Sequence, residues 1–167
     1  MSKGGKKMQV RIGLGMIAAG IGFLIVGLAL RDQATTITTS HSMAPVYLTV
    51  LPNGKTITQL GGWQRVSPTD SDPVYAYADT ISGVGISVSE QPLPASFKDN
   101  VATQVAALAK SYNATDKISA SGTTVYIGTS AKGPQSVILT KNGLLVLIKS
   151  QQVIPNSAWA RYITSLN

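Results

Sequence analysis

Cysteine is missing from all 167 residues of the chain. This excludes disulfides, thiolate metal sites, a cysteine nucleophile and a lipid-modified N-terminal cysteine. Charge is also scarce, because Asp, Glu, Lys and Arg together make up only 13% of the residues, and His41 is the single histidine. Any folded part of this chain must therefore be held together by its core alone.

Acidic residues are the rarer charge, with 7 against 14 basic residues and a net charge of +7. Four of the basic residues, Lys3, Lys6, Lys7 and Arg11, precede the longest apolar run, with no acid among them. The rest of the chain has ten basic and seven acidic residues and no Lys/Arg cluster. Nucleic-acid binding is therefore not expected.

Residues 12–30 form an apolar run without a charged residue. As a helix this run is roughly 28 Å long, close to the thickness of a bilayer core. Positive charge before the run predicts a cytoplasmic N-terminus and an extracytoplasmic C-terminal part. The run is too long for a signal-peptide core and no small-x-small cleavage site follows closely. We therefore expect an uncleaved signal anchor in the cell membrane.

The chain then divides into four parts. Residues 1–11 are a cytoplasmic basic tail, 12–30 a transmembrane helix, 31–45 a Ser/Thr-rich stalk and 46–167 an extracytoplasmic domain. In the membrane, the expected partners are the lipid bilayer and a second transmembrane helix that packs against Gly13, Gly20 and Gly27. These glycines are seven residues apart and so lie on one helix face.

The domain has alternating β-rich runs and turn signals. Residues 46–51 and 55–60 flank Pro52-Asn53-Gly54 and predict a β-hairpin. Further strands are expected at 74–81 and 84–90, separated by a turn signal at Ser82-Gly83, and at 123–128, 135–140 and 144–150. The expected order is about four strands, a helix, three strands and a helix. The fold class is α+β, with a small, largely antiparallel sheet, one central helix and one C-terminal helix.

Both helices are predicted from apolar stripes. The central helix is expected to begin at Ser96 as N-cap, with Asp99 completing a capping box. Its stripe comprises Phe97, Val101, Val105, Leu108, Ala109 and Tyr112. The C-terminal helix is expected to open at Pro155-Asn156 and to place Trp159, Tyr162, Ile163 and Leu166 on one side.

One short motif points to catalysis. Ser40-His41-Ser42-Met43-Ala44-Pro45 resembles the serine box of type I signal peptidases, which follows a transmembrane segment. The resemblance implies that Ser42 is a nucleophile and that a lysine acts as its base. The family's lysine box and glycine-aspartate-serine box have no counterpart here, and a serine without a positioned base is a weak nucleophile. We therefore expect no enzyme, with a serine hydrolase using Ser42 as the alternative.

The remaining candidates favour structural roles. His41 has no neighbouring metal ligand or triad partner. The acids Asp70, Asp72 and Asp79 are candidate calcium ligands, but the segment 70–73 lacks the glycine and distal glutamate of a calcium loop, which favours a turn. Tyr75 and Tyr77 share one strand face, which predicts core packing or, alternatively, a groove for a small ligand or glycan. Asn113-Ala114-Thr115 matches a glycosylation sequon by pattern. No catalytic, cofactor or metal residue is predicted.

The C-terminal part carries a wider resemblance. The Lys141-Asn142-Gly143 hairpin, the apolar strand after it and the helix with Trp159 resemble small sheet domains of unknown function on bacterial single-span membrane proteins. This resemblance implies no activity. The resulting hypothesis is a signal-anchored, single-pass bacterial membrane protein whose exported domain binds or scaffolds an unknown envelope protein.

Overall fold

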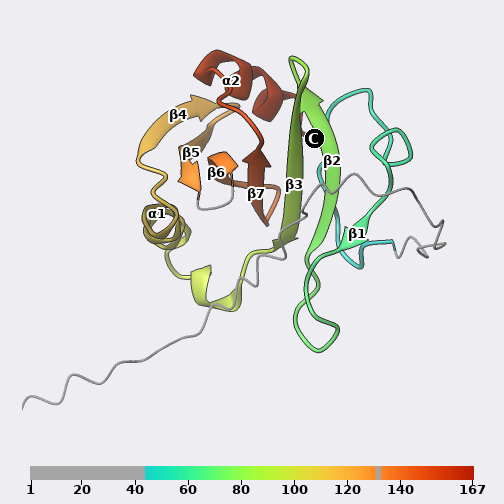
Figure 1. Cartoon of the computed structure of the whole chain (residues 1–167). Coiled ribbons are helices and arrows are strands. Elements are labelled where there is room, and N and C mark those ends of the chain that lie inside the picture. The colour runs from blue at the N-terminus through green and yellow to red at the C-terminus, as the bar shows by residue number, and fades with distance from the viewer. Residues whose placement is uncertain (1–43, 131–132) are drawn as a thin grey trace, which may run out of the picture.

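The computed structural model describes residues 44–130 and 133–167 (Figure 1). Its elements are, in chain order, β1 (Gln64–Arg65), β2 (Tyr75–Ile81), β3 (Val84–Pro92), the 3-10 helix η1 (Ala95–Phe97), α1 (Val101–Ser111), β4 (Asp116–Ala120), β5 (Thr123–Ser130), β6 (Gly133–Lys141), β7 (Leu144–Ser150) and α2 (Asn156–Ser165). The expected α+β class, with a central and a C-terminal helix, is confirmed.

The seven strands form one sheet in the order β1-β2-β3-β7-β6-β5-β4, and every neighbouring pair is antiparallel. Two strand groups that are separate in sequence meet at the centre, where β3 pairs with β7 from Ile86↔Ser150 to Pro92↔Leu144. The most sequence-distant pairing therefore lies in the middle of the sheet.

Three tight turns fix the hairpins. Ser82, Ser121 and Asn142 have φ values of 51°, 51° and 49°, and each is followed by a glycine with positive φ. Two consecutive residues with positive φ make a type I′ turn, whose twist matches that of antiparallel strands. The turn signals at Ser82-Gly83 and Asn142-Gly143 were both expected from the sequence.

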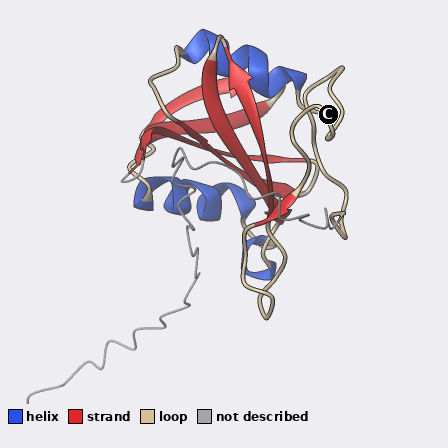
Figure 2. Cartoon of the chain, turned by 45° about the vertical axis from the view of Figure 1, so that its right-hand side comes forward, coloured by secondary structure: helices blue, strands red, loops and turns tan. Residues whose placement is uncertain are grey.

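The sheet is curved and carries a helix on each face. In Figure 2 the two helices lie on opposite sides of the strands. Helix α2 contacts both β2 and β4, which stand near opposite edges of the sheet, so the sheet curves around it. Helix α1 contacts β5 and β6. We call the α2 side the concave face and the α1 side the convex face.

Each face has its own apolar cluster, because side chains alternate along a strand. The convex cluster comprises Phe97, Val105, Ala109, Ala114, Tyr126, Ile138, Leu145 and Leu147. The larger concave cluster includes Val50, Trp63, Tyr75, Tyr77, Val88, Val137, Val146, Ile148, Trp159 and Ile163. Trp159, from the predicted stripe of α2, is fully buried.

The predicted hairpin around Pro52-Asn53-Gly54 is wrong. The Leu51 amide donates to the Asn167 carbonyl at 3.1 Å, and the Asn167 amide donates to the Leu51 carbonyl at 3.1 Å. Pro52 forms a bridge with Leu166. Residues 55–60 close into a turn in which the Thr56 amide donates to the Gln59 side chain. We call residues 46–53 the strap. The strap thus bonds to the C-terminal segment through Leu51, Pro52 and Asn53, and it forms no hairpin with residues 55–60.

The start of the central helix also differs from the prediction. Residues around Ser96 form the separate turn η1, and α1 is capped by Asn100, whose Oδ1 accepts from the Thr103 amide at 3.2 Å. The strand β4 was not predicted, and the order becomes three strands, α1, four strands and α2.

The predicted transmembrane helix is not among the elements described above. Among residues 44–130 and 133–167, no helix is long and apolar enough to cross a bilayer. The expected span at 12–30, with Gly13, Gly20 and Gly27, lies outside the described residues, as do His41 and Ser42.

Candidate functional site

The acidic loop after β1 is organised by an arginine. The Arg65 guanidinium donates to the carbonyls of Pro68, Thr69 and Ser71 at 2.9, 3.2 and 2.9 Å. Asp70 and Asp72 are exposed in this loop. In the part of the chain that the structure describes, no three His, Asp or Glu side chains gather as a metal site would require.

The tyrosines of β2 point into the concave cluster. Tyr75 and Tyr77 are 1% and 3% exposed, and Trp63 stands edge-on to both rings at 6.4 and 5.2 Å between centroids. Edge-to-face packing of this kind stabilises a core. The tyrosine face is therefore buried and does not line an open groove.

Two buried acids share this face. The sequence singles out Asp79 only as a candidate calcium ligand, and it does not single out Glu90. The first, Glu90, follows Ile86 and Val88 at the inward positions of β3 and is fully buried. Its Oε2 accepts the Val50 amide at 3.1 Å, whereas its Oε1 has no hydrogen-bond partner within residues 44–130 and 133–167. Burial raises the pKa of the Glu90 carboxyl from 4.5 to about 7, and the Val50 amide offsets only part of that rise.

The strap covers Glu90. The Tyr47 hydroxyl donates to the Glu90 carbonyl oxygen and accepts from the Tyr75 amide at 3.2 Å. It thus bridges β2 and β3 at the position where Tyr75 and Glu90 face each other in the register. Burial raises the pKa of Tyr47 to about 12, so this hydroxyl keeps its proton at neutral pH.

The second acid, Asp79, joins three elements. Its side chain is 3% exposed and forms an ion pair with Lys55, in the loop after the strap. One oxygen also accepts the Thr80 amide at 2.7 Å, and the other accepts the Tyr162 hydroxyl of α2 at 3.2 Å. Burial, followed by the nearby Tyr77 and Asp79, raises the pKa of Tyr162 far above its ordinary value. Both Asp79 oxygens are therefore committed to structural bonds.

The two acids lie at separate places on the sheet. Asp79 pairs across the sheet with Ile86, which lies four residues before Glu90 on the same strand. Four residues of strand separate these two backbone positions by about 13 Å. The signal for both acids was present in the sequence, as an acid at an inward position of an otherwise apolar strand face.

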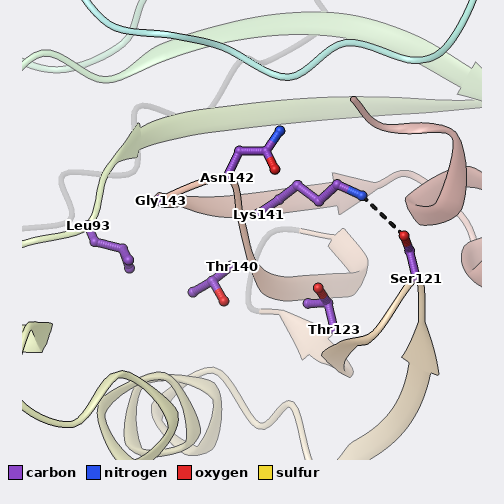
Figure 3. Close-up of a pocket in the computed structure, with 7 residues that line it drawn as sticks. All are labelled: Leu93, Ser121, Thr123, Thr140, Lys141, Asn142 and Gly143. Carbon is purple, nitrogen blue, oxygen red and sulfur yellow. Dashed lines mark hydrogen bonds between the residues drawn. The ribbon is translucent and has the colours of Figure 1, made fainter.

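An open hollow of about 360 Å³ lies at the end of the sheet where two hairpin turns meet the link after β3. Figure 3 shows its lining, which consists of Leu93, Ser121, Thr123, Thr140, Lys141, Asn142 and Gly143. The Lys141 ammonium donates to the Ser121 hydroxyl at 3.4 Å, and the Leu93 amide donates to the Gly143 carbonyl at 3.0 Å.

The lining of this hollow is rich in hydrogen-bond donors. It contains one ammonium, one side-chain amide and three hydroxyl groups, and none of its residues is acidic. Such groups suit an anionic or hydroxyl-bearing ligand group. From the sequence, Lys141-Asn142-Gly143 was interpreted only as a turn, because the Ser121 turn that completes the hollow is distant in the chain.

The sequon at Asn113 lies on the turn after α1. Asn113 is exposed and has a φ of 54°, and the next residue, Ala114, is buried in the convex cluster.

No protein-family model matches the chain, and neither the curated proteins nor the solved structures give a match. A functional assignment therefore rests on the residues themselves.

Proposed function

We propose that this chain is a single-pass membrane protein whose exported domain binds a partner through an anionic group, with the hollow at Lys141 as the point of contact. The charge asymmetry around residues 12–30 supports the anchored topology. The observation that carries the binding role is the donor-rich, acid-free lining of the open hollow.

The hollow suits a group about the size of one sugar ring or smaller. Its volume of about 360 Å³ falls at the low end of known small-ligand sites. The ammonium of Lys141 is held at one side by its bond to Ser121, so it is positioned before any ligand arrives. A charged hydrogen bond to a carboxylate or phosphate is roughly twice as strong as a neutral one. Charge on the ligand should therefore dominate recognition.

The test is a titration of the isotope-labelled domain with a matched pair of sugars, glucuronate and glucose, followed by amide chemical shifts. These sugars differ in a single carboxylate. We expect glucuronate to shift the amides of residues 121–123 and 140–143, and glucose to leave them in place. Lys141→Gln should abolish the shifts, whereas Arg161→Gln, which removes the same charge from exposed α2, should retain them.

Equal responses to the two sugars, or an unchanged response in Lys141→Gln, would contradict an anion site at the hollow. The topology has its own test, since protease added outside intact cells should remove the domain and leave a membrane stub. A fluorophosphonate probe addresses the alternative serine hydrolase, because labelling of Ser42 would replace the binding proposal with a catalytic one.

A further inference from the structure

Three sets of hydrogen bonds attach the strap to the rest of the domain. Tyr47 bridges β2 and β3 through its hydroxyl, and Val50 uses both backbone groups, donating its amide to Glu90 and accepting the Tyr77 hydroxyl at 3.3 Å. Leu51 and Asn53 then bond to the C-terminal segment. The side chains of Val46 and Leu48 point outward and are 77% and 89% exposed. The strap is therefore held on its inner side by these polar contacts together with the buried side chain of Val50 and the packing of Tyr47 and Leu51 on the concave cluster.

Glu90 is the only carboxyl side chain among the described residues that bonds directly to the strap. The titratable groups nearest to it are Tyr47 on the strap and Tyr75 and Tyr77 on β2, whereas Asp79 lies farther along β2, opposite Ile86. On β7 the inward neighbours are Leu144, Val146 and Ile148, and on α2 the nearest titratable group of the cluster is Tyr162. The ammonium of Lys55 is paired with Asp79.

Among the described residues, no cation therefore compensates a negative charge on Glu90. In the same part of the chain, one of its oxygens has a single amide donor, and the other has none. A carboxylate in this position loses its hydration and gains one hydrogen bond, which favours the neutral acid. Displacement of the strap would return Glu90 to water, where the charged form is stable.

We propose that the strap is a pH-sensitive latch, closed over protonated Glu90 and loosened when Glu90 loses its proton. The direction follows from linkage. The closed form binds the proton more tightly than the open form, so rising pH favours opening. The size of the effect follows from the pKa of Glu90, which is about 7 with the strap closed and 4.5 in water. These two values predict that the equilibrium constant for opening of the strap rises roughly 70-fold between pH 5 and pH 8.

The latch lies where the domain continues toward the predicted anchor. The strap joins the stalk to the sheet, so its release would lengthen the connection between the two. Acidification would hold the domain close to its stalk, and alkaline pH would allow it to move farther away. This effect is independent of the hollow at Lys141, which lies at the turns of other hairpins.

The latch can be tested by hydrogen–deuterium exchange of the full chain in lipid nanodiscs, from pH 5 to pH 8, with correction for intrinsic exchange. The measured quantity is the protection factor of the Val50 amide, which donates to Glu90. We expect it to fall roughly 70-fold across this range in the wild type. In Glu90→Gln it should stay constant, because glutamine retains an acceptor without a titrating group. Asp116→Asn, the same chemical change at an exposed position, should behave as the wild type.

A second variant tests the latch without altering the acid. Tyr47→Phe removes the bridging hydroxyl and should lower the Val50 protection about tenfold at every pH, with the pH dependence retained. A wild-type protection factor that does not change with pH would overturn the proposal. So would a pH dependence that persists in Glu90→Gln, or a Tyr47→Phe variant that exchanges like the wild type.

Discussion

Gly128 of β5 is the position where a single methyl group should damage the fold most. A Cβ built there would lie 2.1 Å from the Asn113 carbonyl oxygen and 2.3 Å and 2.5 Å from Ala114 Cα and N. All three are backbone atoms of the turn after α1. A glycine in a strand often marks such a close approach of another backbone.

The turn cannot move aside easily, because it is bonded to the end of α1. The Ala114 amide donates to the Ala109 carbonyl at 2.9 Å, and the Asn113 amide donates to the Lys110 carbonyl at 3.1 Å. Ala114 is also 2% exposed within the convex cluster. Relief of the clash requires a displacement of more than an ångström in a close-packed interior. Overpacking costs about 1–3 kcal/mol, and contact with backbone puts Gly128→Ala at about 3 kcal/mol.

The control is Gly85→Ala in β3. A Cβ at Gly85 would meet only the Gln151 side chain, at 3.3 Å from its Oε1, and Gln151 is exposed and can rotate away. Alanine is also favoured over glycine in a strand by roughly 0.5–1 kcal/mol. Gly85→Ala should therefore leave the free energy of unfolding unchanged or slightly higher.

Urea denaturation followed by tryptophan fluorescence measures both variants, since Trp63 and Trp159 are buried and report on the concave cluster. We expect a lower midpoint for Gly128→Ala with an unchanged slope. Equal unfolding free energies for the two variants would refute the inferred contact between β5 and the turn after α1.

Two further predictions concern buried polar groups. The pKa of Glu90 is about 7 when folded and 4.5 when unfolded, so the folded state binds more protons between these values. The free energy of unfolding should therefore fall by about 3 kcal/mol as pH rises from 4.5 to 7, and a chemical-denaturation series should show that Glu90→Gln lacks this fall. Gln135 Oε1 accepts both the Ile154 amide at 2.7 Å and the Trp159 indole at 3.0 Å. Gln135→Leu leaves both donors unpaired and should lower the unfolding free energy by about 2–4 kcal/mol, whereas a loss below 0.5 kcal/mol would contradict this role.

The sequence predicted the structure correctly where an element is determined by residues that are neighbours in the chain. Ser82-Gly83 and Asn142-Gly143 adopt the positive φ values that their hairpins require. The stripe of α2 is buried as its spacing indicates. The same kind of signal failed at Asn53-Gly54, because the strap is bonded by Asn167 and Ser165, far along the chain. No local pattern could indicate that partner.

The candidate sites divide in the same way. The buried tyrosines were expected on one face of β2, and their role as core residues follows from strand alternation. The latch acid Glu90 could have been found by asking which inward position of β3 carries charge. The hollow could not, because Ser121 and Lys141 meet only through the pairing of β4 with β5 and of β5 with β6. β4 itself was missed because Asp116-Lys117 begins it with residues that disfavour strands.

The central pairing of β3 with β7 has a consequence for how the domain is made. The β2–β3 hairpin is complete early in the chain, yet Val88 meets Ile148 only after α1 and three further strands have been synthesised. Until then β3 presents an unpaired strand edge, which is a template for wrong pairing. Contacts between residues so distant in sequence also slow folding. A nascent chain should therefore expose this edge of β3 for a long interval, and the sheet is completed only when β7 is added.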